Sequence, residues 1–155
     1  MSVSPPITEP ELDSRQLAAW RGLLRSHACL VKALDSELEA AHGLPLTSYE
    51  VMVYLQSADE HRMRMCDLAA SILLSRSGLT RLVDRLERDG LIERVSCPHD
   101  ARGSYAQLTD AGREKLRLAR DTHLAGVRQH FLAHFGDTEL DTLNEFWGRL
   151  TPPCC

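Results

Sequence analysis

The sequence lacks the features that define several large classes of protein. It contains no run of about twenty apolar residues, so it predicts no membrane-spanning helix and no membrane partner. Cysteine is scarce, with five in 155 residues and no C-x-x-C pair, which argues against a disulfide framework and a structural zinc site. A glycine-rich phosphate loop, a G-x-S-x-G motif and an H-E-x-x-H motif are all missing, so neither an enzyme nor a cofactor is expected.

The first residues also lack the basic and apolar regions of a secretory signal. Together with the odd number of cysteines, this favours free thiols and a cytoplasmic location. Residues 1–13 are rich in Pro, Ser and acidic residues, and we expect them to form a flexible arm, with residues 151–155 as a tail. The region 14–150 has the length of one ordinary domain.

Basic residues are fewer than acidic ones, 18 against 22, which gives a formal net charge of −4. That total argues against a nucleic-acid ligand, but the distribution of charge argues for one. Between residues 62 and 102, eight arginines face six acidic residues, whereas the rest of the chain holds ten basic residues against sixteen acidic ones. The middle third is therefore locally basic, as is typical of a nucleic-acid-binding face on an acidic body.

Mostly apolar residues recur every seven positions near the N-terminus, the spacing of a helix that packs along another helix. One series is Leu17, Leu24, Val31 and Leu38, and the second is Trp20, His27, Leu34 and Ala41. A long helix is therefore predicted over about 14–42, ended by Gly43 and Pro45. Long helices are also predicted over about 109–150, with Thr109 as N-cap and a break at Gly136. Their combined apolar surface favours a homodimer.

The segment over about 46–108 has the pattern of a winged helix-turn-helix. Thr47 is expected to cap a short helix, with Glu50 at the capping-box position, and "MCDLAAS" is expected to form a second. A third helix is predicted between Ser75, its N-cap, and Gly90, which ends it. After it, "LIERVS" and "YAQL" alternate as strands around "CPHDARGS", which suits a hairpin tip. The predicted fold is mainly α, a winged helix-turn-helix between long N- and C-terminal dimerisation helices.

The third helix separates an apolar face from a basic one. Its apolar residues, spaced i, i+3, i+4 and i+7, predict a buried stripe of Leu79, Leu82, Val83 and Leu86. Recognition helices contact bases mainly through their N-terminal residues. The residues of this helix expected to contact DNA are Ser75, Arg76, Ser77, Gly78, Thr80, Arg81, Arg85 and Arg88. A solvated face is the alternative, in which the i,i+4 ion pairs would be Asp84–Arg88 and Arg85–Asp89.

Three motifs resemble the core of the MarR family of bacterial regulators. They are "LSRSGLTRLVDRLERDGLIER" over 74–94, an Asp-x-Arg at 100–102 and "LTDAGR" over 108–113. The resemblance is dense within residues 67–116, and the order of the flanking helices extends it over nearly the whole chain. It implies a homodimeric repressor that binds a pseudo-palindromic double-stranded DNA operator and is released by a small aromatic or phenolic effector.

The same resemblance assigns roles to individual residues. Residues 75–88 would enter the major groove, Arg102 would reach the minor groove, and Asp100 would orient the wing by pairing with an arginine such as Arg94. Members of the family often have a further arginine where this chain has Ala101, which weakens the expected hold of the wing on DNA. The effector pocket would lie where the dimer helices meet the winged domain. Its candidate lining residues are Trp20, His27, Tyr49 and Met52, with an ordinary packed core as the alternative.

Three other functions stay open at the level of the sequence. A zinc-responsive regulator would need three or four convergent ligands, and the available histidines are His42, His123, His130 and His134. A redox-responsive regulator would depend on a reactive thiol, for which Cys29 is the candidate. A winged helix used only for protein contacts would bind no duplex, whereas binding to DNA weakens steeply with salt.

Overall fold

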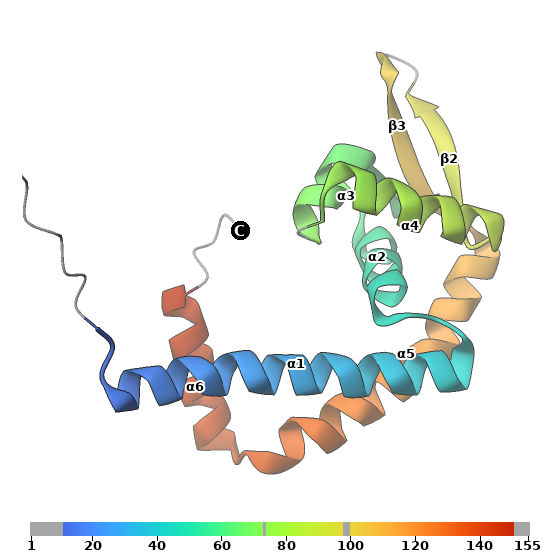
Figure 1. Cartoon of the computed structure of the whole chain (residues 1–155). Coiled ribbons are helices and arrows are strands. Elements are labelled where there is room, and N and C mark those ends of the chain that lie inside the picture. Colours follow the sequence, from blue (N-terminus) through green and yellow to red (C-terminus); the bar gives the residue numbers. More distant parts are fainter. Residues whose placement is uncertain (1–10, 73, 98–99, 151–155) are drawn as a thin grey trace, which may run out of the picture.

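The chain folds into a pair of long helices and a smaller head that contains the sheet (Figure 1). The computed structural model describes residues 11–72, 74–97 and 100–150, without the side chains of residues 97 and 100–102. The helices are α1 (Ser14–His42), α2 (Leu46–Ser57), α3 (Met65–Ser71), α4 (Arg76–Arg88), α5 (Asp110–His130) and α6 (Asp137–Leu150). Two short 3-10 turns are η1 (Asp59–His61) and η2 (Leu132–His134), and the strands are β1 (Arg62–Arg64), β2 (Ile92–Cys97) and β3 (Asp100–Leu108). The prediction of a mainly α, winged helix-turn-helix protein with long terminal helices is confirmed.

Helix α1 begins and ends with local signals that are visible in the sequence. Asp13 and Gln16 form a capping box, in which each side chain accepts a hydrogen bond from the other residue's backbone N–H, at 2.8 and 2.9 Å. The helix ends where Gly43 adopts a φ of 60°, a left-handed conformation that favours glycine. Toward its C-terminus Leu38 is buried, whereas Leu24 on the same seven-residue series is half exposed. The N-terminal half of α1 therefore presents apolar side chains outward.

Helix α2 begins one residue earlier than Thr47, so the prediction that Thr47 caps it is wrong. Pro45 occupies the N-cap position and supplies no side-chain hydrogen bond. The backbone N–H of Leu46 donates instead to the carboxylate of Asp35, on α1, at 2.8 Å. The expected capping box with Glu50 fails for the same reason, because a side chain eleven residues away satisfies the helix start.

A three-stranded antiparallel sheet, in the order β1-β3-β2, lies beside the helices of the head. Strands β2 and β3 form the predicted hairpin, with Ile92 opposite Leu108. The sequence pattern does not predict β1, because three residues are too few to show an alternation. It pairs Met63 with Ala106, after a turn in which residues 60 and 61 have φ of 53° and 54°. The strand joins the wing to the start of α3.

Helix α5 starts directly after β3, at a junction that is packed from several sides. The Thr109 hydroxyl accepts a hydrogen bond from the backbone N–H of Gly112 at 3.0 Å and donates to the carbonyl of Gly90 at 2.7 Å. A Cβ on Gly112 would overlap the carbonyl oxygen of Leu91, so a larger residue does not fit. The start of α5 is thus fixed against the loop between α4 and β2.

Candidate nucleic-acid interface and effector cleft

The core fixes the orientation of α4. Ser75 caps the helix by accepting a hydrogen bond from the backbone N–H of Gly78 at 3.1 Å. A Cβ on Gly78 would lie 3.1 Å from the same hydroxyl oxygen, so glycine leaves room for the cap. The predicted apolar stripe is at most 7% exposed and consists of Leu79, Leu82, Val83 and Leu86. With that face buried, the opposite face of α4 is turned outward.

The outward face of α4 carries the residues that the sequence assigned to DNA. Arg76, Ser77, Thr80, Arg81 and Arg88 are exposed. The Thr80 hydroxyl donates to the backbone carbonyl of Arg76 at 2.8 Å, which leaves its oxygen able to accept. Arg85 is exposed as well, so four arginine side chains reach solvent from one helix, and their guanidinium groups can bond both phosphate oxygens and base edges.

Arg85 differs from the other arginines of α4 because it is held against α2. Its Nη2 donates to the hydroxyl of Ser48 at 2.9 Å, and Ser48 is fully buried. The alternative pairing of Arg85 with Asp89 is not the one observed. Arg85 thus satisfies a buried hydroxyl and ties the recognition helix to the helix behind it, because a buried polar group without a partner is costly.

Arg94, on β2, links the wing to α4 through two carboxylates. Its Nη2 lies 2.5 Å from Asp84 Oδ1, and its Nη1 lies 2.5 Å from Glu87 Oε2. The hydrogen bond to Asp84 is the largest cause of the raised pKa of Arg94, followed by burial, which opposes it, and by Glu87. The helix spacing suggested that Asp84 pairs with Arg88. In the structure Asp84 is instead neutralised by Arg94 of the wing.

The wing and α4 lie together at the end of the head that is remote from α1 (Figure 1). Asp100 and Arg102 belong to β3, but their side chains lie outside the described part of the structure. The expected pairing of Asp100 with Arg94 also falls there. What the structure does show is that Arg94 is engaged by the carboxylates of α4.

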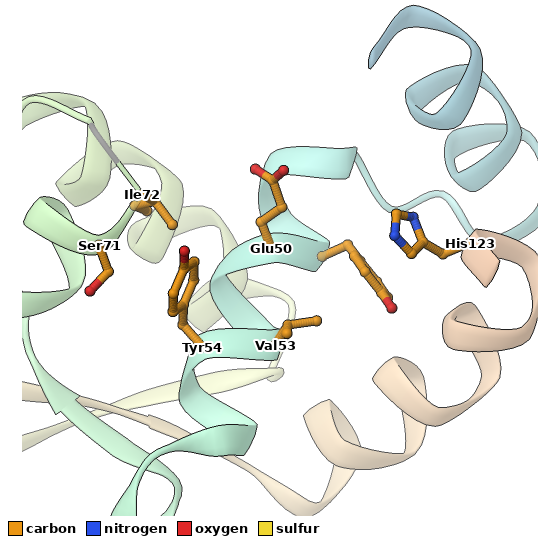
Figure 2. Close-up of a pocket in the computed structure, with 7 residues that line it drawn as sticks. Glu50, Val53, Tyr54, Ser71, Ile72 and His123 are labelled. Atoms are coloured by element: carbon orange, nitrogen blue, oxygen red, sulfur yellow. The ribbon is translucent and has the colours of Figure 1, made fainter. Parts of the chain in front are cut away.

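A second candidate site is a cleft between α2 and α5, divided by two aromatic rings in tilted contact. Tyr49 and His123 have ring centroids 4.5 Å apart at an interplanar angle of 35°. Toward α3 there is a hollow of about 370 Å³, shown in Figure 2, whose other lining residues are Glu50, Val53, Tyr54, Ser71 and Ile72. On the far side of the rings a hollow of about 590 Å³ includes Arg113, Arg117 and Arg120 in its wall. One hollow thus has the carboxylate of Glu50 in its wall, and the other has three guanidinium groups, of which those of Arg113 and Arg117 pair with Asp110 and Glu114.

Burial changes the ionisation of the groups that line the cleft. Desolvation lowers the pKa of His123, whose Nδ1 is buried without a hydrogen-bond partner in the described part of the chain. Burial raises the pKa of Tyr49, against the opposing charge of Arg120. It also raises the pKa of Glu50, against the opposing charge of His27. The cleft therefore favours a neutral imidazole, which can donate or accept a hydrogen bond.

The four residues predicted for the effector pocket are not brought together. Tyr49 lines both hollows. Met52 is fully buried in the core and lines neither, and Trp20 is 52% exposed on α1, away from both linings. His27 lines neither hollow, but it lies close enough to Glu50 for its charge to lower the pKa of that carboxyl group, against the larger effect of burial.

Sequence reasoning missed the residues that α5 contributes to the cleft. The larger hollow takes its basic wall from positions 113, 117 and 120 and its ring from His123. These positions are three or four residues apart and share one face of a helix. That spacing is the signal in the sequence, and the apolar residues of the same helix obscure it.

Two of the four histidines that could have bound zinc, His42 and His130, instead form contacts between the long helices α1 and α5. His130 Nε2 lies 2.6 Å from Glu37 Oε1, and His42 Nε2 lies 2.8 Å from the Thr122 hydroxyl. In the described ranges, no three His, Cys, Asp or Glu side chains gather where they could hold a metal ion. Over the same ranges, no helix is long and apolar enough to cross a membrane.

A helix-turn-helix with an adjoining hairpin, set between long terminal helices, defines a winged helix-turn-helix protein. A family model described as the MarR family matches residues 42–103. The crystal structure of AbsC, a MarR family regulator from Streptomyces coelicolor, has a TM-score of 0.86 and 32% identity, covering 92% of this chain and 95% of that one. Sco3205, a MarR family regulator from the same organism in complex with DNA, has a TM-score of 0.87 and 31% identity, covering 95% of each chain. The chain belongs to the MarR family.

Curated relatives carry the names of regulators. Transcriptional repressor MprA of Escherichia coli is 35% identical over 110 residues, which make up 71% of this chain and 62% of MprA. The chain thus matches less than two thirds of the length of that repressor. Membership of this family agrees with the prediction that the chain is not an enzyme.

Proposed function

We propose that this chain is a sequence-specific, double-stranded-DNA-binding transcriptional repressor that acts as a homodimer. The observation that carries the proposal is the geometry of α4. Core leucines hold one face of this helix, while Arg76, Arg81 and Arg88 reach solvent from the other. The major groove of B-DNA admits an α-helix and presents a distinct pattern of donors and acceptors for each base pair.

The relatives support this function. Sco3205 has been crystallised with DNA, and MprA is named as a repressor. DNA binding and repression are properties of those two proteins. Assigning the same function to this chain depends on the recognition helix that the chain shares with them. The acidic charge outside residues 62–102 fits the proposal as well, since it limits non-specific attraction to phosphate.

The apolar surface of the terminal helices supports the homodimer. Large apolar side chains that are at least 38% exposed include Leu12, Trp20, Leu23, Leu24, Val31, Phe146 and Leu150. Exposed apolar side chains concentrated on the terminal helices suit an interface with a second copy of the chain. A two-fold dimer would set its two recognition helices one DNA turn apart, roughly 34 Å, and so match a pseudo-palindromic operator.

The cleft beside Tyr49 and His123 is the proposed effector site. Its larger hollow combines three arginines with the two tilted rings, which suits a planar aromatic acid whose carboxylate meets a guanidinium group. An effector releases DNA only if it binds the DNA-incompetent state more tightly, with a typical coupling of about 1–3 kcal/mol. The predicted pocket residues Trp20, His27 and Met52 are not part of this proposed site.

The test is to select duplexes from a random pool with the purified protein and to measure binding over a range of salt concentrations. The proposal expects a shared half-site repeated with two-fold symmetry, and an affinity that falls steeply with salt. A protein-interaction module would enrich no common sequence. That result would overturn the proposal.

A further inference from the structure

Between the recognition helix and the wing lies a hollow of about 300 Å³ that adjoins the N-terminal turns of α4. Its walls come from three elements that are distant in sequence. Arg64 and Cys66 come from the junction of β1 and α3, Arg76 and Thr80 from the first turns of α4, and Ser104 from β3. The hollow is therefore a joint feature of the helix-turn-helix and the hairpin.

The position of this hollow relates it to the shape of DNA. On a duplex the major and minor grooves are separated by a sugar-phosphate backbone. A protein that places α4 in the major groove and a hairpin in the next minor groove must let one backbone pass between the two elements. The hollow occupies that position, because α4 forms one of its walls and β3 forms another.

The chemistry of the walls suits an anion. Arg64 is exposed, and its guanidinium carbon lies 5.8 Å from the centroid of the Tyr105 ring, a contact that restricts the side chain. Arg76 adds a second guanidinium group from α4, and Ser104 adds a hydroxyl from β3. Charge-assisted hydrogen bonds from arginine to phosphate are among the strongest polar contacts in proteins.

We propose that this hollow seats one backbone phosphate at the boundary between the two grooves, and that Arg64 is a phosphate-binding residue outside the recognition helix. The inference rests on the proposed DNA-binding function. Such a contact carries no sequence information but fixes the register of α4 and the wing on the duplex.

A matched pair of variants tests the role of Arg64. Arg62 lies two residues earlier on β1, 5.2 Å from the centroid of the same Tyr105 ring and paired with Glu60, but it does not line the hollow. Arg64→Gln should weaken binding to selected and scrambled duplexes alike, on the order of tenfold. It should also reduce the slope of log K against log salt by about one. Arg62→Gln removes the same charge from the same strand and should leave that slope unchanged.

Neutral phosphate analogues test the position of the contact without altering the protein. Methylphosphonates placed one at a time along a selected duplex should weaken binding of the unaltered protein at one phosphate in each half-site, where the strand crosses from the major to the minor groove. The Arg64→Gln variant should lose no further affinity at that phosphate. Equal sensitivity of both proteins there would overturn the proposal.

Two exposed thiols provide an independent readout. Cys66 lies in the hollow, whereas Cys29 lies on α1, so the duplex should slow alkylation of Cys66 and leave that of Cys29 unchanged. Peptide mass spectrometry separates these two sites. If the protein binds no duplex, the proposed function fails. If it binds a selected duplex while Cys66 stays fully reactive and Arg64→Gln keeps the original salt slope, only the phosphate seat is refuted.

Discussion

At the scale of single residues, Arg81 is the side chain expected to matter most for reading bases. It is exposed beside Thr80 in the N-terminal half of α4, where recognition helices reach base edges. Arg81→Ala should cost about 1–3 kcal/mol of affinity for the selected duplex and much less for a scrambled one. Fluorescence anisotropy measures both affinities. The control is Arg128→Ala, which removes an exposed arginine of α5. If Arg81→Ala loses equal affinity for both duplexes, Arg81 does not contact a base.

His123 predicts a pH dependence of stability. Burial lowers its pKa below the ordinary value of 6.5, so the unfolded state takes up a proton at a higher pH than the folded state. The stability that comes from keeping this imidazole neutral is complete above pH 6.5 and is lost as the pH falls through the folded-state pKa. His123→Gln should therefore flatten the decline of the free energy of unfolding between pH 7.5 and 5.5, measured with urea.

A second variant separates this effect from general acid sensitivity. His134→Gln removes an exposed histidine on η2 and should keep the pH slope of the unaltered protein. If the free energy of unfolding of His123→Gln and of His134→Gln declines equally as the pH falls, the buried imidazole is not the source of the pH slope.

The amphipathic spacing of α4 predicted its faces correctly, because a helix with four leucine or valine positions on one stripe has little choice of orientation. Arg85 shows where that reasoning stops. Its place at the edge of the outward face suggested DNA or Asp89 as a partner. The hydrogen bond that the structure shows runs to Ser48, 37 residues earlier in the chain, and a DNA contact by this exposed side chain stays a prediction. Met52 shows the same limit, since periodicity marks a residue as inward without telling whether a cavity or a packed core receives it.

At the scale of elements, Arg94 should control how firmly the wing is held to α4. Arg94→Met removes both contacts, with Asp84 and Glu87, which lie on a different element. Partly exposed ion pairs contribute about 0.2–1 kcal/mol each, so global stability should fall only modestly. Hydrogen exchange should nevertheless become faster in β2 and β3. Arg117→Met is the control, because its pair with Glu114 lies within α5, and unchanged exchange with Arg94→Met would argue that the wing is held elsewhere.

Element boundaries were predictable where the signal is local and failed where it is tertiary. The caps of α4 and α5, Ser75 and Thr109, lie at the helix starts that they stabilise. The start of α2 depends on Asp35 of α1, which no short window reveals. Strand β1 forms because it pairs with the edge of β3. Its three residues are too few to show the alternation by which a strand is predicted.

At the scale of the whole molecule, the dimer should depend on the outward face of α1. Leu24 is 50% exposed, so Leu24→Glu should leave the protomer folded but place a charge in the proposed interface. Sedimentation should then show monomers, and affinity for the two-fold operator should fall. Ser36→Glu adds the same charge to an exposed position of α1 outside both seven-residue series and should remain dimeric. A Leu24→Glu protein that sediments as a dimer would place the interface elsewhere.

Release by an effector can be tested through Arg120. Titration with benzoate or hydroxybenzoates should lower operator affinity, because a carboxylate in the larger hollow meets the guanidinium groups of α5. Arg120→Gln should weaken that response and leave operator affinity without ligand unchanged. A variant that responds like the original protein would exclude this wall as the carboxylate site.

The closed junction between β3 and α5 has a mechanical consequence. Thr109 and Gly112 bind the start of α5 to the loop after α4, so the long helix, the hairpin and the recognition helix meet at one packed junction. A tilt of α5 would therefore move the hairpin together with the helix. The angle at which α5 crosses α1 would therefore set the distance between the hairpins of the two protomers in a symmetric dimer.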